Sequence, residues 1–152
     1  MKKIHILMVL VGLLFFGCVD NNETFTNQTN MSDDDDILQN SEIEKLEIIH
    51  FHSTNQCYSC ITVGDYAEET INTYFKYELQ SGLIEFKHIN GELPENRDLV
   101  TKYGATGSSL WLGTYVNEEF YAEQNIDVWY KINNKNEYMN YLKGVIENKL
   151  KG

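Results

Sequence analysis

Two of the three cysteines in this chain, Cys57 and Cys60, are separated by only two residues. The apolar segment 46–52 precedes them and predicts a strand, and the amphipathic segment that begins at Cys57 predicts a helix. This order places both thiols at the N-terminus of a helix, where unpaired backbone N–H groups carry partial positive charge. That charge stabilises a thiolate, which is the form of cysteine that attacks disulfides and binds metals.

The two thiols are expected to have different roles. Cys57 lies at the first turn and should reach solvent, so we expect it to be the nucleophile that forms a mixed disulfide. Cys60 lies one turn further into the helix and should be more buried, which suits a resolving thiol. Tyr58 and Ser59 lie between the thiols, and we expect both to contact a substrate. A structural disulfide and a static metal site are the alternatives for this pair.

Two histidines flank Phe51 in the predicted strand. Because side chains alternate along a strand, His50 and His52 should point to the face opposite Phe51. His52 is nearer to the loop, and we expect it to exchange a proton with Cys60; packing against the loop, or capping it, is the alternative. Together with Cys57 and Cys60, His52 also offers three ligands for Cu(I) or Zn(II) in a second, metal-binding hypothesis.

Composition and charge limit the classes of function. Hydrophobic residues make up 42% of the 152 residues, which is enough for one compact domain, and we place that domain at residues 45–152. The formal net charge of −11 argues against a nucleic-acid partner, because phosphate binding needs a basic surface. Residues 20–44 hold eight acidic side chains and no Lys or Arg. Segment 19–44 is also rich in Asn and Thr and poor in apolar residues, so we predict a disordered tether.

The first 18 residues have the pattern of a secretory signal peptide. Two lysines precede the apolar segment 4–16, which is shorter than the ~20 residues of a membrane-spanning helix. Residues 14–18, Leu-Phe-Phe-Gly-Cys, resemble the lipobox of lipoprotein signal peptides, although the two phenylalanines depart from its usual pattern. The resemblance implies cleavage before Cys18 and lipidation of its thiol, hence a membrane anchor outside the cytoplasm. An uncleaved signal-anchor is the alternative.

The predicted tether carries three matches to the N-x-S/T glycosylation pattern, at Asn22, Asn27 and Asn30. A composition rich in Asn and Thr can produce such matches by itself, so an unmodified polar spacer is the alternative. The four acidic residues at 33–36 are expected to be a solvated charge run rather than a weak cation site.

Apolar periodicity and turn residues predict the remaining elements of the domain. They are a helix from 57 until Ser81-Gly82, a strand over 83–90, a short helix over 94–103, a strand over 109–116, a strand over 119–123, a helical turn over 126–131 and a last helix. Asn134 should cap that last helix, with Glu137 completing a capping box, and residues 117–118 should form a hairpin turn. The predicted fold class is α/β, in the order β-α-β-α-β-β-α, with a mixed four-stranded sheet and helices on both faces.

This order, with C-x-x-C opening the first helix, resembles the thioredoxin fold in its minimal form. Residues 102–110, Lys-Tyr-Gly-Ala-Thr-Gly-Ser-Ser-Leu, are similar to the thioredoxin run Lys-Tyr-Gly-x-x-Gly that precedes an apolar residue and a cis-proline. Within this superfamily the chain most resembles small thioredoxin-like proteins named nitrophenyl compound nitroreductase subunit, ArsF family. The matching residues are Phe51-His52 before the C-x-x-C, and Tyr103-Gly104 with Ser108-Ser109-Leu110 after it.

The resemblance implies a thiol–disulfide oxidoreductase that acts on protein or small-molecule thiols and disulfides, with no cofactor beyond a redox-active Cys57–Cys60 disulfide. It also implies substrate contacts from Ser108 and Ser109, since Ser109 stands where the fold usually has cis-proline. Phe51 falls near the position of the buried acid under many thioredoxin sites, so that acid is expected to be absent. The sequence has no flavin-binding motif, so nitroreductase activity is not expected. A non-catalytic binding protein that kept the fold is the third hypothesis.

Overall fold

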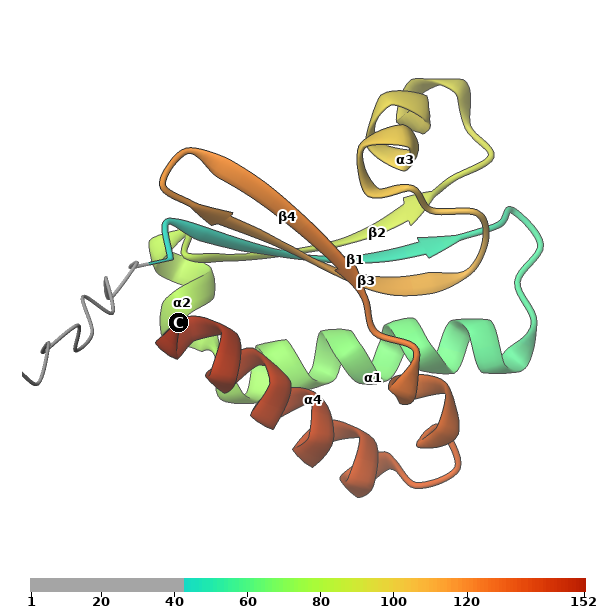
Figure 1. Cartoon of the computed structure of the whole chain (residues 1–152). Helices are drawn as coiled ribbons and strands as arrows, with labels where there is room; N and C mark the ends of the chain where they lie inside the picture. Colours follow the sequence, from blue (N-terminus) through green and yellow to red (C-terminus); the bar gives the residue numbers. More distant parts are fainter. Residues whose placement is uncertain (1–42) are drawn as a thin grey trace, which may run out of the picture. The chain divides into compact units, whose positions relative to one another are not determined.

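The computed structural model describes residues 43–152 of the chain. Within them, four strands form one mixed sheet in the spatial order β2, β1, β3, β4 (Figure 1). Their bounds are Lys45–His52 for β1, Ile84–Asn90 for β2, Ser109–Val116 for β3 and Glu119–Gln124 for β4. β1 pairs parallel with β2 and antiparallel with β3, and β3 pairs antiparallel with β4. The prediction of an α/β fold with a mixed four-stranded sheet is confirmed.

Several predicted features lie outside the described residues. They are the leader 1–18, the lipidation site Cys18 and the three sequons at Asn22, Asn27 and Asn30. The last two residues of the predicted tether are described, and they belong to the folded domain. Ile43 is buried, and the Glu44 N–H donates to the Tyr115 carbonyl at 2.9 Å. The packed domain therefore includes residues before the predicted boundary at Lys45.

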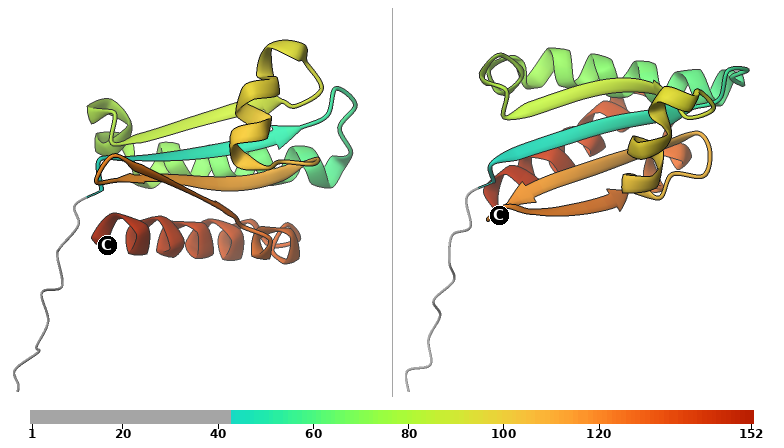
Figure 2. Two further views of the ribbon diagram at one scale, coloured as in Figure 1. Left: turned by 45° about the horizontal axis from the view of Figure 1, so that its top comes forward. Right: turned by 90° about the horizontal axis from the view of Figure 1, so that it is seen from above.

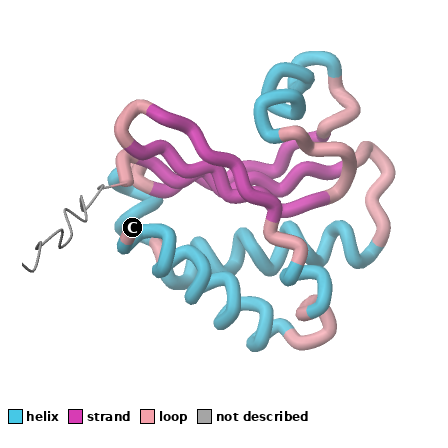
Figure 3. Tube along the Cα trace, viewed as in Figure 1, coloured by secondary structure: helices cyan, strands magenta, loops and turns pink. Residues whose placement is uncertain are grey.

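Helices cover both faces of the sheet. Helices α1 (Tyr58–Tyr74) and α4 (Lys135–Lys151) lie along one face, and α3 (Arg97–Tyr103) lies on the other (Figure 2). The connections also hold the short helix α2 (Lys76–Ser81) and two 3-10 turns, η1 (Pro94–Asn96) and η2 (Asp127–Tyr130). The tube view shows both long helices on the same side of the sheet (Figure 3).

Side-chain alternation along β1 divides the apolar core into two clusters. On the α1 and α4 face, the buried residues include Leu46, Ile48, Val63, Ala67, Ile71, Leu110, Leu112 and Leu142. On the α3 face, they are Ile49, Phe51, Tyr103 and Ala105. β1 is therefore covered on both faces, which explains its nearly continuous apolar sequence.

The helix predicted to run from residue 57 to Ser81-Gly82 is wrong in one respect, because it is broken at Phe75. The Phe75 backbone leaves helical geometry, with φ −126° and ψ 36°, and α2 begins at the next residue. The Phe75 side chain is buried in the same cluster as Ile71. Burying a phenylalanine contributes about 2 kcal/mol, which offsets the interruption of the helix. Periodicity did not show the break because Phe75 keeps its place on the apolar face.

Local signals at the end of the chain are largely confirmed. The Asn134 side chain accepts a hydrogen bond from the Glu137 N–H at 3.2 Å and caps α4 as predicted. The Glu137 carboxylate, however, pairs with Lys131 at 3.0 Å. Asn117 and Glu118 both have positive φ, 52° and 66°, as the two-residue hairpin turn between β3 and β4 requires.

Glu47 is a buried carboxylate on the α3 face of β1. It accepts hydrogen bonds from Tyr103 Oη at 2.8 Å, Tyr115 Oη at 2.9 Å and Lys45 Nζ at 2.9 Å. Burial by itself raises the pKa of this carboxyl, but the bonds from Lys45 and the two tyrosines lower it to about 2. The charged form is therefore favoured in the folded state, and it ties α3 and β3 to the central strand.

Helix α1 lies close against the sheet at Gly64. A Cβ atom at this position would overlap His50 Nδ1 and would lie 2.6 Å from His50 Cε1 and 2.9 Å from His88 Cε1. Only a residue without a side chain lets α1 lie this close to the paired histidines of β1 and β2.

We predict that Gly64→Ala lowers the free energy of unfolding by about 2 kcal/mol, because the added methyl group overpacks the helix–sheet contact. Gly144→Ala is the matched control, since it also replaces a helical glycine, and a Cβ there meets nothing within 4 Å. It should be neutral or stabilising by about 0.5–1 kcal/mol through helix propensity. Urea denaturation of the two variants tests this, and equal free energies of unfolding would contradict the packing argument.

Candidate functional site

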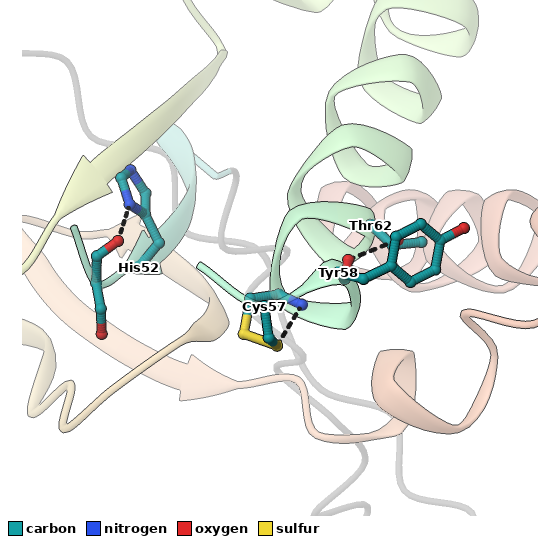
Figure 4. The surroundings of a disulfide bond; sticks show 6 residues. His52, Cys57, Tyr58 and Thr62 are labelled. Carbon is teal, nitrogen blue, oxygen red and sulfur yellow. Dashed lines mark hydrogen bonds between the residues drawn. A yellow bond between two sulfur atoms is a disulfide. The ribbon is translucent and has the colours of Figure 1, made fainter. Parts of the chain in front are cut away.

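Cys57 and Cys60 are joined by a disulfide at the beginning of α1, with their Cα atoms 5.1 Å apart. Cys57 is the N-cap residue, and its Sγ accepts a hydrogen bond from the Cys60 N–H at 3.2 Å (Figure 4). The sulfur therefore occupies the place that an oxygen of Ser, Asp or Asn takes in most helix caps. This geometry stabilises negative charge on Cys57 after reduction.

The loop between β1 and α1 is held by residues at the end of β2. The Thr54 N–H donates to Glu92 Oε2 at 2.9 Å, and Asn90 Nδ2 donates to Thr54 Oγ1 at 3.0 Å. The Gly91 N–H also donates to the His52 carbonyl at 2.9 Å. These contacts fix where the chain leaves β1, and hence where the helix with the two cysteines starts.

The two cysteines differ in exposure. Cys57 is exposed and Cys60 is half-buried, which is the difference expected between an attacking and a resolving thiol. Tyr58 is 81% exposed, so its ring is free to meet a partner, while its carbonyl accepts from Thr62 Oγ1 inside the helix. Ser59 is half-buried beside the disulfide.

Ser108 and Ser109, at the start of β3, differ in how far they are buried. Ser108 is half-buried, whereas Ser109 is only 3% exposed. The Ser109 hydroxyl donates to the Gly107 carbonyl and accepts from Trp111 Nε1, both at 2.9 Å. These internal bonds occupy the hydroxyl that was expected to contact a substrate.

His52 lies at the end of β1, and its Nδ1 donates to the Ser53 carbonyl at 3.0 Å. Among the hydrogen bonds of residues 43–152, none joins His52 to either cysteine, and Figure 4 shows its ring turned away from the disulfide. The geometry fits the loop-capping alternative for His52.

His50 is the histidine that lies next to Cys60. It is 1% exposed, and the backbone of Cys60 is close enough to raise its pKa. Burial nevertheless lowers the pKa of His50 to about 4, with further lowering from His88 and His52. Within the described part of the chain, His50 Nε2 is the buried side-chain atom left without a hydrogen-bond partner.

The sequence argument placed His50 and His52 together on the face opposite Phe51, as observed, and expected His52, which is closer to Cys60 along the chain, to exchange a proton with Cys60. It also placed Phe51 near the position of the buried acid under many thioredoxin sites, and this stays a prediction. Phe51 packs against Tyr103 on the α3 face, with ring centroids 5.5 Å apart. The sequence did contain one signal for a close contact between the helix and the sheet near Cys60. Gly64 follows Cys60 by four residues, so both residues lie on the same face of α1.

His50 is also paired with His88 on the neighbouring strand β2. The two Nδ1 atoms are 2.9 Å apart, and the rings meet edge to face. His88 Nε2 lies 3.4 Å from Glu68 Oε2 on α1. The sequence argument missed this pair, which depends on the parallel register of β1 and β2.

Within residues 43–152, no group of three or more His, Cys, Asp or Glu side chains is arranged to hold a metal ion. A hollow of about 210 Å³ adjoins His52, Ser53 and Gly107. Another hollow, of about 840 Å³, is lined by residues of the β3–β4 hairpin and the end of α4, at the opposite end of β3 from Ser109.

No family model, curated protein or solved structure matches this chain. None of the helices within residues 43–152 is both long and apolar enough to span a bilayer.

We predict that the stability of the domain falls between about pH 6.5 and pH 4 because of His50. Its pKa is about 4 when folded and about 6.5 when unfolded, so the unfolded chain binds the extra proton in this window. The stabilisation that comes from neutral His50 should be fully present above pH 6.5. The free energy of unfolding should fall by about 3 kcal/mol as the pH approaches 4.

Urea denaturation across this pH range checks the prediction. His50→Gln should remove most of the fall, whereas His52→Gln should retain it. The lowered pKa of Glu47 acts at still lower pH, below about 4.5, and should persist in both variants. An unchanged pH dependence in His50→Gln would assign the effect to another group.

Proposed function

We propose that this chain is a thiol–disulfide oxidoreductase with a thioredoxin-like fold, anchored to a membrane outside the cytoplasm. The observation that carries the proposal is the disulfide at the start of α1, in which Cys57 Sγ accepts the Cys60 N–H. A sulfur in this position is accessible to another disulfide and favoured as a thiolate.

The arrangement of the sheet supports the thioredoxin-like part of the proposal. A parallel β1–α1–β2 unit is followed by an antiparallel hairpin and a final helix, in the sheet order β2-β1-β3-β4. The segment with Ser108 and Ser109 enters β3 next to the end of β1, since Ser109 pairs with Phe51. This is where the resemblance implies that the substrate-binding segment should lie.

The chemistry then needs only the two cysteines and a substrate disulfide. The Cys57 thiolate attacks one substrate sulfur and forms a mixed disulfide, and the first substrate thiolate leaves. Cys60 then attacks Cys57, which forms the intramolecular disulfide and releases the second substrate thiolate. Two electrons pass from the dithiol to the substrate, and the reverse sequence oxidises a substrate dithiol.

The membrane anchor rests on the sequence of the leader. A lipidated Cys18 followed by the acidic tether would hold the domain near a membrane surface outside the cytoplasm, where disulfide exchange is most used. The exposed Tyr58 beside Cys57 suits contact with an extended protein or peptide substrate.

We predict that the full chain shows a reversible two-electron couple when equilibrated in dithiothreitol or glutathione redox buffers. All proteins should carry Cys18→Ser, so that Cys57 and Cys60 are the only thiols in the chain. Alkylation of free thiols then gives the reduced fraction of this pair. Cys57→Ser should abolish the couple. Stoichiometric metal in the purified protein, with weaker metal binding in His52→Ala, would favour the metal-binding hypothesis instead.

We further predict that Cys60→Ser accumulates a mixed disulfide between Cys57 and its substrate, because no resolving thiol remains to release the partner. The trapped species is isolated from cells without reductant and identified by mass spectrometry after reduction. The double variant Cys57→Ser, Cys60→Ser is the matched control and should trap nothing. Equal capture by both variants would mean that the partner is held without thiol exchange, as in the binding-protein hypothesis.

A further inference from the structure

We propose that the hollow adjoining His52, Ser53 and Gly107 binds a lysine or arginine side chain that lies a few residues from the reactive cysteine of a substrate. The inference rests on the oxidoreductase function proposed above, and it names the kind of substrate that the site would select. It stands on the position of the hollow, on its apolar floor, and on one carboxylate, that of Glu92, which hydrogen bonds hold at its rim.

The hollow lies at the end of the sheet where the loop to the disulfide begins. The parallel strands β1 and β2 end there, at His52 and Asn90, and the antiparallel β3 starts there at Ser109 (Figure 1). Most of the lining comes from the last residues of β1, from the residues that follow β1 and β2, and from residues 105–107, which precede β3. In open α/β sheets, the carboxyl ends of parallel strands are where ligands commonly bind.

The hollow is within reach of a substrate that is bonded to Cys57. Ser53 lines the hollow and lies four residues before Cys57, so their Cα atoms are at most ~14 Å apart. An extended peptide spans the same distance in about four residues. A residue up to about four positions from the substrate cysteine is therefore close enough to place its side chain in the hollow while the mixed disulfide exists.

The size and the lining of the hollow suit one long side chain. Its volume is about 210 Å³, below the ~300–1,000 Å³ of sites that hold drug-sized ligands. Among the lining residues, Phe51 and Ala105 are buried and Val100 is half-buried, whereas Glu92 and Thr106 are exposed. Lys and Arg match this apolar floor and polar rim, because they bury an alkyl stem against apolar surface and keep the charged head in water.

Glu92 provides a fixed negative charge at the rim. Hydrogen bonds hold both of its ends, since its Oε2 accepts the Thr54 N–H at 2.9 Å and its own N–H donates to Asn90 Oδ1 at 3.0 Å. The bond from the Thr54 backbone lowers the pKa of Glu92, so the carboxylate is charged at neutral pH. A carboxylate has about four acceptor positions, so that of Glu92 retains the capacity to bind a cation.

No cation of the described chain neutralises this carboxylate. Within residues 43–152, no Lys, Arg or His forms an ion pair with it. Residues 51–68, which include both cysteines, contain no Lys or Arg, and neither do residues 103–116. Arg97 and Lys102 are the cations of α3, and neither lines the hollow. Lys102 Nζ lies instead 3.9 Å from the centroid of the Phe120 ring. The charge is therefore available to a group from outside the chain.

Synthetic peptides test this site in the reduced full chain carrying Cys18→Ser. Each peptide has one cysteine, activated as a 2-pyridyl disulfide, and one lysine placed two to four positions before or after it. The Cys57 thiolate bonds to the peptide sulfur, and the electron pair of the broken disulfide leaves with pyridine-2-thiolate, whose absorbance reports the rate. The matched peptide carries N-acetyl-lysine at the same position, which keeps the alkyl stem but removes the charge.

The best-placed lysine peptide should react about five-fold faster than its acetylated partner, as expected for one partly exposed ion pair. Glu92→Gln should lose this preference, although its amide oxygen can still accept the Thr54 N–H. Glu95→Gln is the matched control and should keep the preference, because Glu95 is an exposed carboxylate nearby that does not line the hollow. Thr106→Lys places a cation at the rim and should also abolish it.

The outcomes distinguish the two proposals. If the reduced pair releases pyridine-2-thiolate from none of the peptides, the proposed oxidoreductase function is overturned. Equal rates for every lysine peptide and its acetylated partner, a preference that Glu92→Gln retains, or one that Glu95→Gln loses to the same extent would overturn the cationic-side-chain site and leave the oxidoreductase proposal standing. The comparison uses the ratio of two rates within one variant, so a general change in folding or thiol reactivity does not alter it.

Discussion

The site depends on the close approach of α1 to the central strand at Gly64. Without a side chain at this position, the helix lies directly on His50 and His88. This steric constraint keeps His50 buried, while the hydrogen bonds between the β1–α1 loop and the end of β2 fix where the helix with the two cysteines starts.

The central strand β1 carries different kinds of interaction on its two faces. On the α3 face, Glu47 forms a charged hydrogen-bonded centre with Tyr103 and Tyr115, and Phe51 packs against Tyr103. These contacts are internally satisfied and stabilise the sheet. On the α1 face, His50 bonds to His88, and its Nε2 is buried without a hydrogen-bond partner among the described residues.

Much of the fold could be predicted because its signals are local. The β3 bounds, the turn at Asn117 and Glu118 and the Asn134 cap depend on residues within a few positions of one another. The break at Phe75 could not be predicted, because an apolar residue on the correct helical face gives no sign that the backbone leaves the helix to bury it.

The amino-acid sequence by itself determined the order of elements, the juxtaposition of Cys57 and Cys60 at a helix start, and the face to which His50 and His52 point. Spacing along the chain is enough for these, because helix and strand periodicities are fixed by backbone geometry. Only the tertiary structure decided which histidine lies next to Cys60, that His88 joins it, and that the Ser109 hydroxyl is already bonded. Those outcomes depend on strand register and on the depth of helix packing, which bring together residues that are far apart in the chain.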